Sequence, residues 1–189
     1  MRLAVYCGSR TGTRAAYAQA AAELGRELAS RGIGLVYGGA SVGLMGVLAD
    51  AVLHGGGEAV GVMPEAIVDR EIAHAGLTRL HVVATMHERK ALMAHLSDGF
   101  VALPGGSGTL DELFEAWTWG QLGFHGKPIG LLDVEGYFSH LLAFADDMVE
   151  HGFLARAHRA MLITERDARR LLDALAVYQP PPDNFVELR

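Results

Sequence analysis

The sequence has little of several features that mark other classes of protein. Its single cysteine, Cys7, cannot form an internal disulfide. No apolar run approaches the ~20 residues that span a bilayer, and the run after Met1-Arg2 is too short for a signal peptide. We therefore expect a cytoplasmic protein without a membrane segment.

Clusters of basic and metal-binding residues are also lacking. The formal net charge is -6 and the basic residues are scattered, so we expect no contact with a nucleic-acid backbone. His87-Glu88 is followed by Ala91 where a zinc-binding helix needs its second histidine, and no other cluster has ligand spacing. We expect no metal. Cys7 has no histidine near it in sequence, which favours a small buried hydrophobe over a nucleophile.

What the sequence does have is a chain of 189 residues, enough for one core, with half its residues apolar and 24 glycines. Short apolar runs recur along it, continuous rather than alternating, as in strands buried on both faces. These predicted strands are Leu3–Tyr6, Gly34–Tyr37, Ala59–Met63, Leu80–Ala84, Phe100–Leu103, Ile129–Leu132 and Met161–Ile163.

Segments of helical period separate these runs. Ala15–Arg31 carries an apolar stripe and stops at Gly32, and Val42–His54 ends in a run of glycines. Short gaps between strands and helices require parallel strands with right-handed crossovers. We predict an α/β fold over residues 1–177, a Rossmann-like, doubly wound parallel sheet in a three-layer sandwich, followed by an extended tail over 178–189, where three prolines prevent a helix.

Ligands of such sheets bind beyond the carboxyl ends of the strands. The ends of the first and second predicted strands and that of the fifth are rich in glycine: Cys7-Gly8-Ser9, Gly38-Gly39-Ala40 and Pro104-Gly105-Gly106. The third and fourth strands lead into Met63-Pro64-Glu65 and the segment Thr85–Lys90. We expect substrate contacts at Gly8, Ser9, Gly38, Gly39 and Gly43.

The segment Pro104–Glu112 is the sharpest signal, because it joins a buried strand to an amphipathic helix. Its glycines let backbone amides converge at a helix start, where the partial positive charge favours a phosphate. Thr109-x-x-Glu112 could instead be a simple capping box. A cap does not explain three glycines in the preceding four positions, so we favour the phosphate site.

Thr85-x-x-Glu88 also resembles a capping box at a helix start. It would put Arg89 and Lys90 at the positive end of the helix dipole, so that an anion should offset them unless both are solvated. The segment Gly38–Gly46 could cradle a phosphate or could serve packing. Cys7–Gly12 misses the G-x-G-x-x-G pattern after the first strand, which argues against a nicotinamide dehydrogenase.

Four motifs in order resemble the Lonely Guy (LOG) family over about residues 2 to 165. They are Gly-Gly-x-x-x-Gly-Leu-Met-Gly at 38–46, Met-His-Glu-Arg-Lys at 86–90, Pro-Gly-Gly-x-Gly-Thr-x-x-Glu at 104–112 and Thr-Trp-x-Gln-Leu-Gly at 118–123. The resemblance implies a cytokinin riboside 5'-monophosphate phosphoribohydrolase, which cuts the N-glycosidic bond of an adenosine-type 5'-monophosphate and needs no cofactor.

The resemblance also implies functional residues. Arg89 and Glu112 would be catalytic, and such proteins are commonly homodimers with sites near the subunit interface. The positions expected to contact substrate are Glu71, Met86, Lys90, Gly105, Gly106, Ser107, Gly108, Thr109, Leu110, Asp111 and Thr118. Two positions depart from the family pattern: Ser107 replaces a frequent aromatic residue, and Ala40 would be strained if its φ were positive.

The chemistry of these residues agrees with glycoside cleavage. A carboxylate such as Glu112 can stabilise an oxocarbenium-like transition state or activate water. Arg89 cannot act as a general acid, since a guanidinium keeps its proton, but it can orient the phosphate or Glu112 or hydrogen-bond the departing base. Met86, Met93, Trp117 or a partner chain could hold an N6-prenyl group.

Two other functions compete. A pyridoxal-phosphate decarboxylase needs a lysine Schiff base, and the chain has only Lys90 and Lys127, the second expected at the opposite edge of the sheet. A carrier of a nucleotide or cofactor would use the same glycine loops without cleavage, but would not need Arg89 and Glu112 together.

Overall fold

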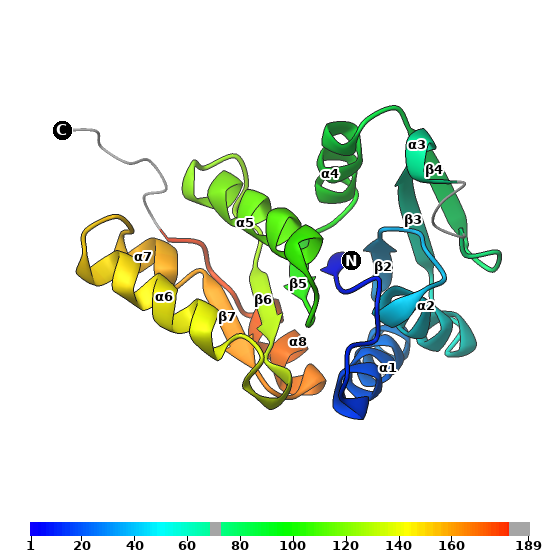
Figure 1. The fold of residues 1–189 in the computed structure, drawn as a ribbon, viewed down its shortest axis with the longest axis horizontal. Helices are drawn as coiled ribbons and strands as arrows, with labels where there is room; N and C mark the ends of the chain where they lie inside the picture. The colour runs from blue at the N-terminus through cyan, green and yellow to red at the C-terminus, as the bar shows by residue number, and fades with distance from the viewer. Residues whose placement is uncertain (69–72, 182–189) are drawn as a thin grey trace.

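The computed structural model describes residues 1–68 and 73–181 and contains one parallel sheet in the order β4-β3-β2-β1-β5-β6-β7 (Figure 1). The strands are β1 Arg2–Tyr6, β2 Gly34–Tyr37, β3 Ala59–Pro64, β4 Arg79–Val83, β5 Gly99–Ala102, β6 Ile129–Leu132 and β7 Leu162–Glu165. The helices are α1 Ala15–Ser30, α2 Gly43–His54, α3 Glu65–Val68, α4 Met86–His95, α5 Ser107–Gln121, α6 Ser139–Glu150, α7 Arg156–Arg159 and α8 Ala168–Ala176, with a 3₁₀ turn η1 at Val134–Gly136.

The two faces of the sheet carry separate apolar cores. Helices α1, α2 and α8 cover one face through residues such as Leu24, Leu48 and Leu171. Helices α4, α5 and α6 cover the other, where Met93 and Trp117 are buried. This confirms the Rossmann-like three-layer sandwich.

The direction of winding reverses between β1 and β5. Strands β1 to β4 follow one another toward one edge, and the chain then returns to place β5 beside β1. The loop after β1 leads to α1 on one face, whereas the loop after β5 leads to α5 on the other. The crevice that forms at such a reversal is where open α/β sheets bind ligands.

The predicted strands are present: two have the predicted bounds, and the ends of the others differ by at most two residues. The prediction of burial on both faces is wrong for β4, because β4 pairs only with β3 and lies at the edge of the sheet. Its Val82 is 50% exposed. A continuous apolar run does not distinguish an edge strand from a central one.

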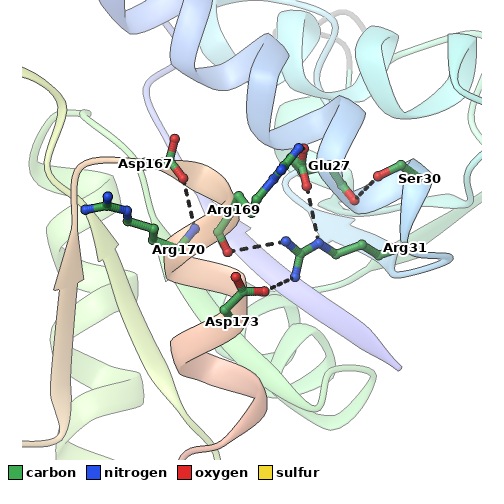
Figure 2. A network of polar contacts seen from close by, with 7 residues as sticks. All are labelled: Glu27, Ser30, Arg31, Asp167, Arg169, Arg170 and Asp173. Carbon is green, nitrogen blue, oxygen red and sulfur yellow. Dashed lines mark hydrogen bonds and ion pairs between the residues drawn. The ribbon is translucent and has the colours of Figure 1, made fainter.

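Helix α1 ends as the sequence indicated, with Gly32 in the left-handed region at φ +64°. A polar network beyond this end ties α1 to α8 (Figure 2). Arg31 lies 2.6 Å from Asp173 and 3.3 Å from Glu27, and it also donates to the carbonyl oxygen of Arg169. The first and last helices of the sandwich are therefore joined at the surface.

After α8 the described chain runs to Pro181 without regular structure, and Pro180 lies beside Gly126. Residues 182–189 of the predicted tail lie outside the described part. None of the helices in the described ranges is long and apolar enough to cross a membrane.

Candidate active site

The start of α5 is built to approach an anion closely. The helix begins at Ser107 with Gly106 as its N-cap. A Cβ on Gly106 or Gly108 would project into open space, so no side chain separates these positions from a ligand. The first amides of a helix have no partner within it and favour negative charge.

The alternative of a capping box at Thr109 is wrong, because the helix starts two residues earlier and Thr109 is 4% exposed within its first turn. The Thr109 hydroxyl occupies the space that a Cβ on Gly105 would need. Gly105 is thus required for packing, whereas Gly106 and Gly108 leave room for a ligand.

The predicted cap at Thr85 is confirmed. Its Oγ1 accepts a hydrogen bond from the backbone N–H of Glu88 at 3.1 Å. The Glu88 carboxylate accepts one at 3.0 Å from the N–H of Ala84, one residue before the position that a capping box would use. This cap sets the start of α4 and hence the positions of Arg89 and Lys90.

Arg89 reaches from α4 toward Glu112 of α5 at the bottom of the crevice. Their Nη2 and Oε1 atoms are 3.9 Å apart, and the two side chains are 8% and 12% exposed. The guanidinium covers Gly38, where a Cβ would collide with it. Arg89 Nε is buried without a hydrogen-bond partner in the described residues. Arg89 therefore holds one donor that no described residue satisfies, beside a carboxylate 3.9 Å from its Nη2 atom.

Lys90 points to another set of α5 carboxylates. Its Nζ lies 3.0 Å from Asp111 and 3.2 Å from Glu115. Burial lowers the pKa of Lys90, but the hydrogen bonds to Asp111 and Glu115 outweigh that effect and the net pKa is raised. The prediction that anions offset Arg89 and Lys90 is confirmed, and the carboxylates that do so belong to α5.

The second glycine loop mainly supports the first. Gly39 and Gly43 have positive φ, whereas Ala40 does not, so Ala40 is unstrained. A Cβ on Gly43 would collide with the backbone of Ser9, and the N–H of Leu44 donates to the carbonyl oxygen of Gly8 at 3.0 Å. Of the two alternatives for this loop, packing accounts for Gly39 and Gly43, while Gly38 makes room for Arg89.

A cleft of about 250 Å³ collects these features. Eleven of the predicted residues line it: Gly8, Ser9, Gly38, Met86, Arg89, Gly106, Ser107, Gly108, Thr109, Asp111 and Glu112. It does not include Gly39, Gly43, Lys90, Gly105, Leu110 or Thr118. Thr118 is exposed on α5. Glu71 lies outside the described residues.

The candidates for a prenyl pocket are reduced to one within this chain. Met93 and Trp117 are buried in the core, whereas Met86 is 44% exposed at the cleft. Trp117 also donates its indole N–H to the carbonyl oxygen of His158.

Sequence reasoning missed several residues around the cleft. Val5 and Met45 line it, and so does Cys7, whose pKa is raised by burial and by the nearby Glu112 carboxylate. Tyr137, after β6, donates its hydroxyl to the carbonyl oxygen of Gly105. Ligands of such sheets bind beyond the carboxyl ends of the strands, and a search after the sixth strand as well would have found Tyr137.

A doubly wound parallel sheet with a glycine-rich helix start and a nearly buried Arg–Glu pair at its switch point defines a Rossmann-like protein with a cleft at the carboxyl ends of its strands. A family model described as "Possible lysine decarboxylase" matches residues 45–175. The cytokinin riboside 5'-monophosphate phosphoribohydrolase LOG1 of Arabidopsis thaliana is 50% identical over 179 residues, covering 95% of this chain and 84% of the relative. LOG of Oryza sativa subsp. japonica is 49% identical over 179 residues, 95% and 74% of the two chains. The chain belongs to this LOG family.

Solved structures support the fold. The molybdenum cofactor carrier protein of Chlamydomonas reinhardtii superposes with a TM-score of 0.71 at 22% identity, over 93% of this chain and 95% of that one. The molybdenum cofactor binding protein of Rippkaea orientalis gives 0.70 at 18% identity, over 93% and 94%. At such identities the similarity concerns the fold and not the ligand.

Proposed function

We propose that this protein hydrolyses the N-glycosidic bond of adenosine-type 5'-monophosphates, with or without an N6 substituent, releasing the free base and ribose 5-phosphate. The observation that carries the proposal is the buried Arg89–Glu112 pair facing the open amides of α5 in one cleft. The LOG relatives, which are named for this reaction, cover nearly the whole chain at about half identity.

The dimensions of α5 suit a nucleotide 5'-monophosphate. A phosphate at the amides of Ser107 to Thr109 would be neutralised by the helix dipole. Glu112 lies five residues after Ser107, roughly 7 Å further along the axis at 1.5 Å per residue. This is the scale of a ribose 5-phosphate, so a phosphate held at the helix start brings the anomeric carbon near Glu112.

At that carbon, Glu112 would stabilise the positive charge that develops as the bond to the base breaks, or would orient the attacking water. Arg89, which lines the cleft, would hydrogen-bond the substrate through its guanidinium, and it cannot release a proton. Because water is largely excluded from the bottom of the cleft, these charges act more strongly there than at the surface.

The competing functions have less support. Lys90 is held as a cation by Asp111 and Glu115, whereas a Schiff base needs a neutral amine. Lys127 donates to the carbonyl oxygen of Ala94 at the opposite edge of the sheet. A nucleotide carrier would bind at the same amides, but it gives no reason for a buried Arg–Glu pair.

A cytoplasmic homodimer completes the proposal. Thr118 of α5 and Leu122, the residue that caps the end of this helix, are both exposed, as is Met86 at the rim of the cleft. A partner subunit on this face would bring Thr118 near a substrate and enlarge the apolar pocket beside Met86. Analytical ultracentrifugation tests this assembly directly.

The test of the reaction is to incubate the purified protein with AMP and, separately, with isopentenyladenosine 5'-monophosphate, and to follow free base by chromatography. Release of base with an equal amount of ribose 5-phosphate supports the proposal, and the ratio of the two rates sets the substrate preference. Binding of both nucleotides without release of base would instead support the carrier.

A further inference from the structure

A second chamber adjoins the catalytic cleft on the other side of the phosphate loop. It has a volume of about 400 Å³, and it shares Gly8, Ser9 and Gly106 with the cleft. The rest of its wall comes from Arg10, Thr11, Gly12, Tyr17, Leu44, Pro104, Gly105 and Tyr137. The mechanism proposed above uses none of the residues that belong to this chamber alone.

The charge of this chamber differs from that of the cleft. Among its lining residues Arg10 carries the only formal charge, whereas the cleft contains the carboxylates of Asp111 and Glu112. The Arg10 side chain makes no ion pair with any residue in the described ranges, while the neighbouring Arg14 is paired with Glu135 at 2.8 Å. An exposed guanidinium in a chamber without carboxylates is suited to an anion.

The chamber is held in shape by contacts between three loops. Tyr17 of α1 and Tyr137 after β6 meet edge to face, with ring centroids 5.7 Å apart. Tyr137 also donates to the Gly105 carbonyl oxygen, and the N–H of Gly8 donates to that of Pro104 at 3.1 Å. Gly12 has a φ of +73° and a Cβ there would collide with the Tyr17 ring. These contacts fix the positions of the groups that line the chamber, which is open to solvent.

The residues shared by the two spaces fix what could enter the chamber. Gly106 precedes the amides at which the proposed function places the 5'-phosphate, so the chamber begins where that phosphate would lie. A group bonded to the far side of the phosphate would point into it. In a nucleoside diphosphate, the second phosphate occupies that position.

We propose that the chamber receives the second phosphate of a nucleoside 5'-diphosphate, held by Arg10, while the nucleoside and its first phosphate occupy the catalytic cleft. This rests on the proposed position of the 5'-phosphate. Nucleoside diphosphates would then compete with the monophosphate substrate at the same site.

The test measures binding of AMP and ADP by calorimetry to the Glu112→Gln protein, so that neither nucleotide is cleaved. ADP should bind about tenfold more tightly than AMP, as expected for one charge-assisted contact. Adding Arg10→Ala should remove this advantage and leave the affinity for AMP unchanged, and Arg10→Lys should restore part of it.

Arg14→Ala is the matched control. Arg14 carries the same charge as Arg10 and lies four positions further along the chain, but its side chain pairs with Glu135 and does not line the chamber. Equal losses of ADP affinity in the Arg10 and Arg14 variants would indicate general electrostatics and overturn the proposal, as would an unchanged preference for ADP in Arg10→Ala. The proposed reaction is judged separately, by release of base from AMP in the wild-type protein, so the two can fail independently.

Discussion

Two groups of arginine and carboxylate side chains stand in contrast in this molecule. At the surface, Arg31 and Arg169 pair with Glu27 and Asp173 between α1 and α8, and Figure 2 shows these side chains meeting within one network. In the crevice, Arg89 and Glu112 are nearly buried but 3.9 Å apart, and Arg89 Nε lacks a partner among the described residues.

The two groups differ in how well their charges are satisfied within the protein. The surface network satisfies its charges with one another and joins two helices, at the small energies typical of exposed pairs. The buried pair is desolvated, which is costly in the free protein, and the Nε of Arg89 has no hydrogen-bond partner among the described residues that would offset this cost. The same residue types thus serve stability in one place and, in the mechanism that we propose, a reaction in the other.

The largest expected effect comes from Glu112→Gln, which removes the charge of the buried carboxylate and keeps its shape. We expect turnover of nucleoside monophosphate to fall by about 10² to 10⁴, with nucleotide affinity changed only slightly. Chromatography of the base and calorimetry measure the two. Turnover that survives unchanged would remove Glu112 from the mechanism.

Arg89→Lys should come next. Lysine keeps the charge but loses the planar guanidinium that can hold two partners at once, so we expect a loss in kcat of roughly 10². Arg31→Lys at the surface is the control and should leave kcat as it is. Equal kcat values for the two variants would abolish the distinction between the regions.

The free energy of unfolding should depend more on the surface pair than on the buried pair, the reverse of the expected effect on kcat. Replacing both members of the buried pair, in Arg89→Met with Glu112→Leu, should leave the free energy of unfolding unchanged or raise it by about 1 kcal/mol or more. The surface pair variant Arg31→Met with Asp173→Leu should lose about 0.5 to 1 kcal/mol. Urea denaturation compares them, and a marked loss only in the buried pair variant contradicts the argument.

Tyr137→Phe probes the support of the phosphate loop. Loss of the hydroxyl that donates to the Gly105 carbonyl oxygen should raise KM about three- to tenfold, the effect of one hydrogen bond. Tyr17→Phe is the matched control, because only its ring contacts Tyr137. Similar KM values for both variants would show that the Gly105 contact does not position the loop.

The smallest expected effect is on acid unfolding and comes from a third pair, Arg2 with Glu58. The hydrogen bond from Arg2, followed by its charge, lowers the pKa of Glu58 against the opposing effect of burial. The stabilisation is therefore present above the ordinary glutamate pKa of about 4.3 and is lost as pH falls through the lower folded value. Since both side chains are about 40% exposed, Glu58→Gln should flatten the acid unfolding curve only slightly.

Much of the fold could be predicted from sequence because its signals are local. Apolar runs gave the strands, and Gly32 and Thr85 gave the boundaries of two helices. The edge position of β4 could not be predicted, since strand order depends on contacts between distant segments. The alternative that we did not favour at Thr109, a capping box, is wrong because the helix begins two residues earlier, at Ser107.

The candidate site divides in the same way. The motifs predicted that Arg89, Glu112 and the glycine loop lie at one edge of the sheet. They did not predict the 3.9 Å separation of the buried pair or the hydrogen bond from the Tyr137 hydroxyl. Those depend on how α4, α5 and the loop after β6 pack in three dimensions. Met93 and Trp117 show the converse, because sequence alone did not reveal that both belong to the core.

The most direct test of the proposed site is a crystal structure of the Glu112→Gln protein with isopentenyladenosine 5'-monophosphate. We expect the phosphate at the amides of Ser107 to Thr109 and the anomeric carbon beside residues 89 and 112. A nucleotide bound with its glycosidic bond away from that pair would contradict the proposed hydrolytic role of Arg89 and Glu112.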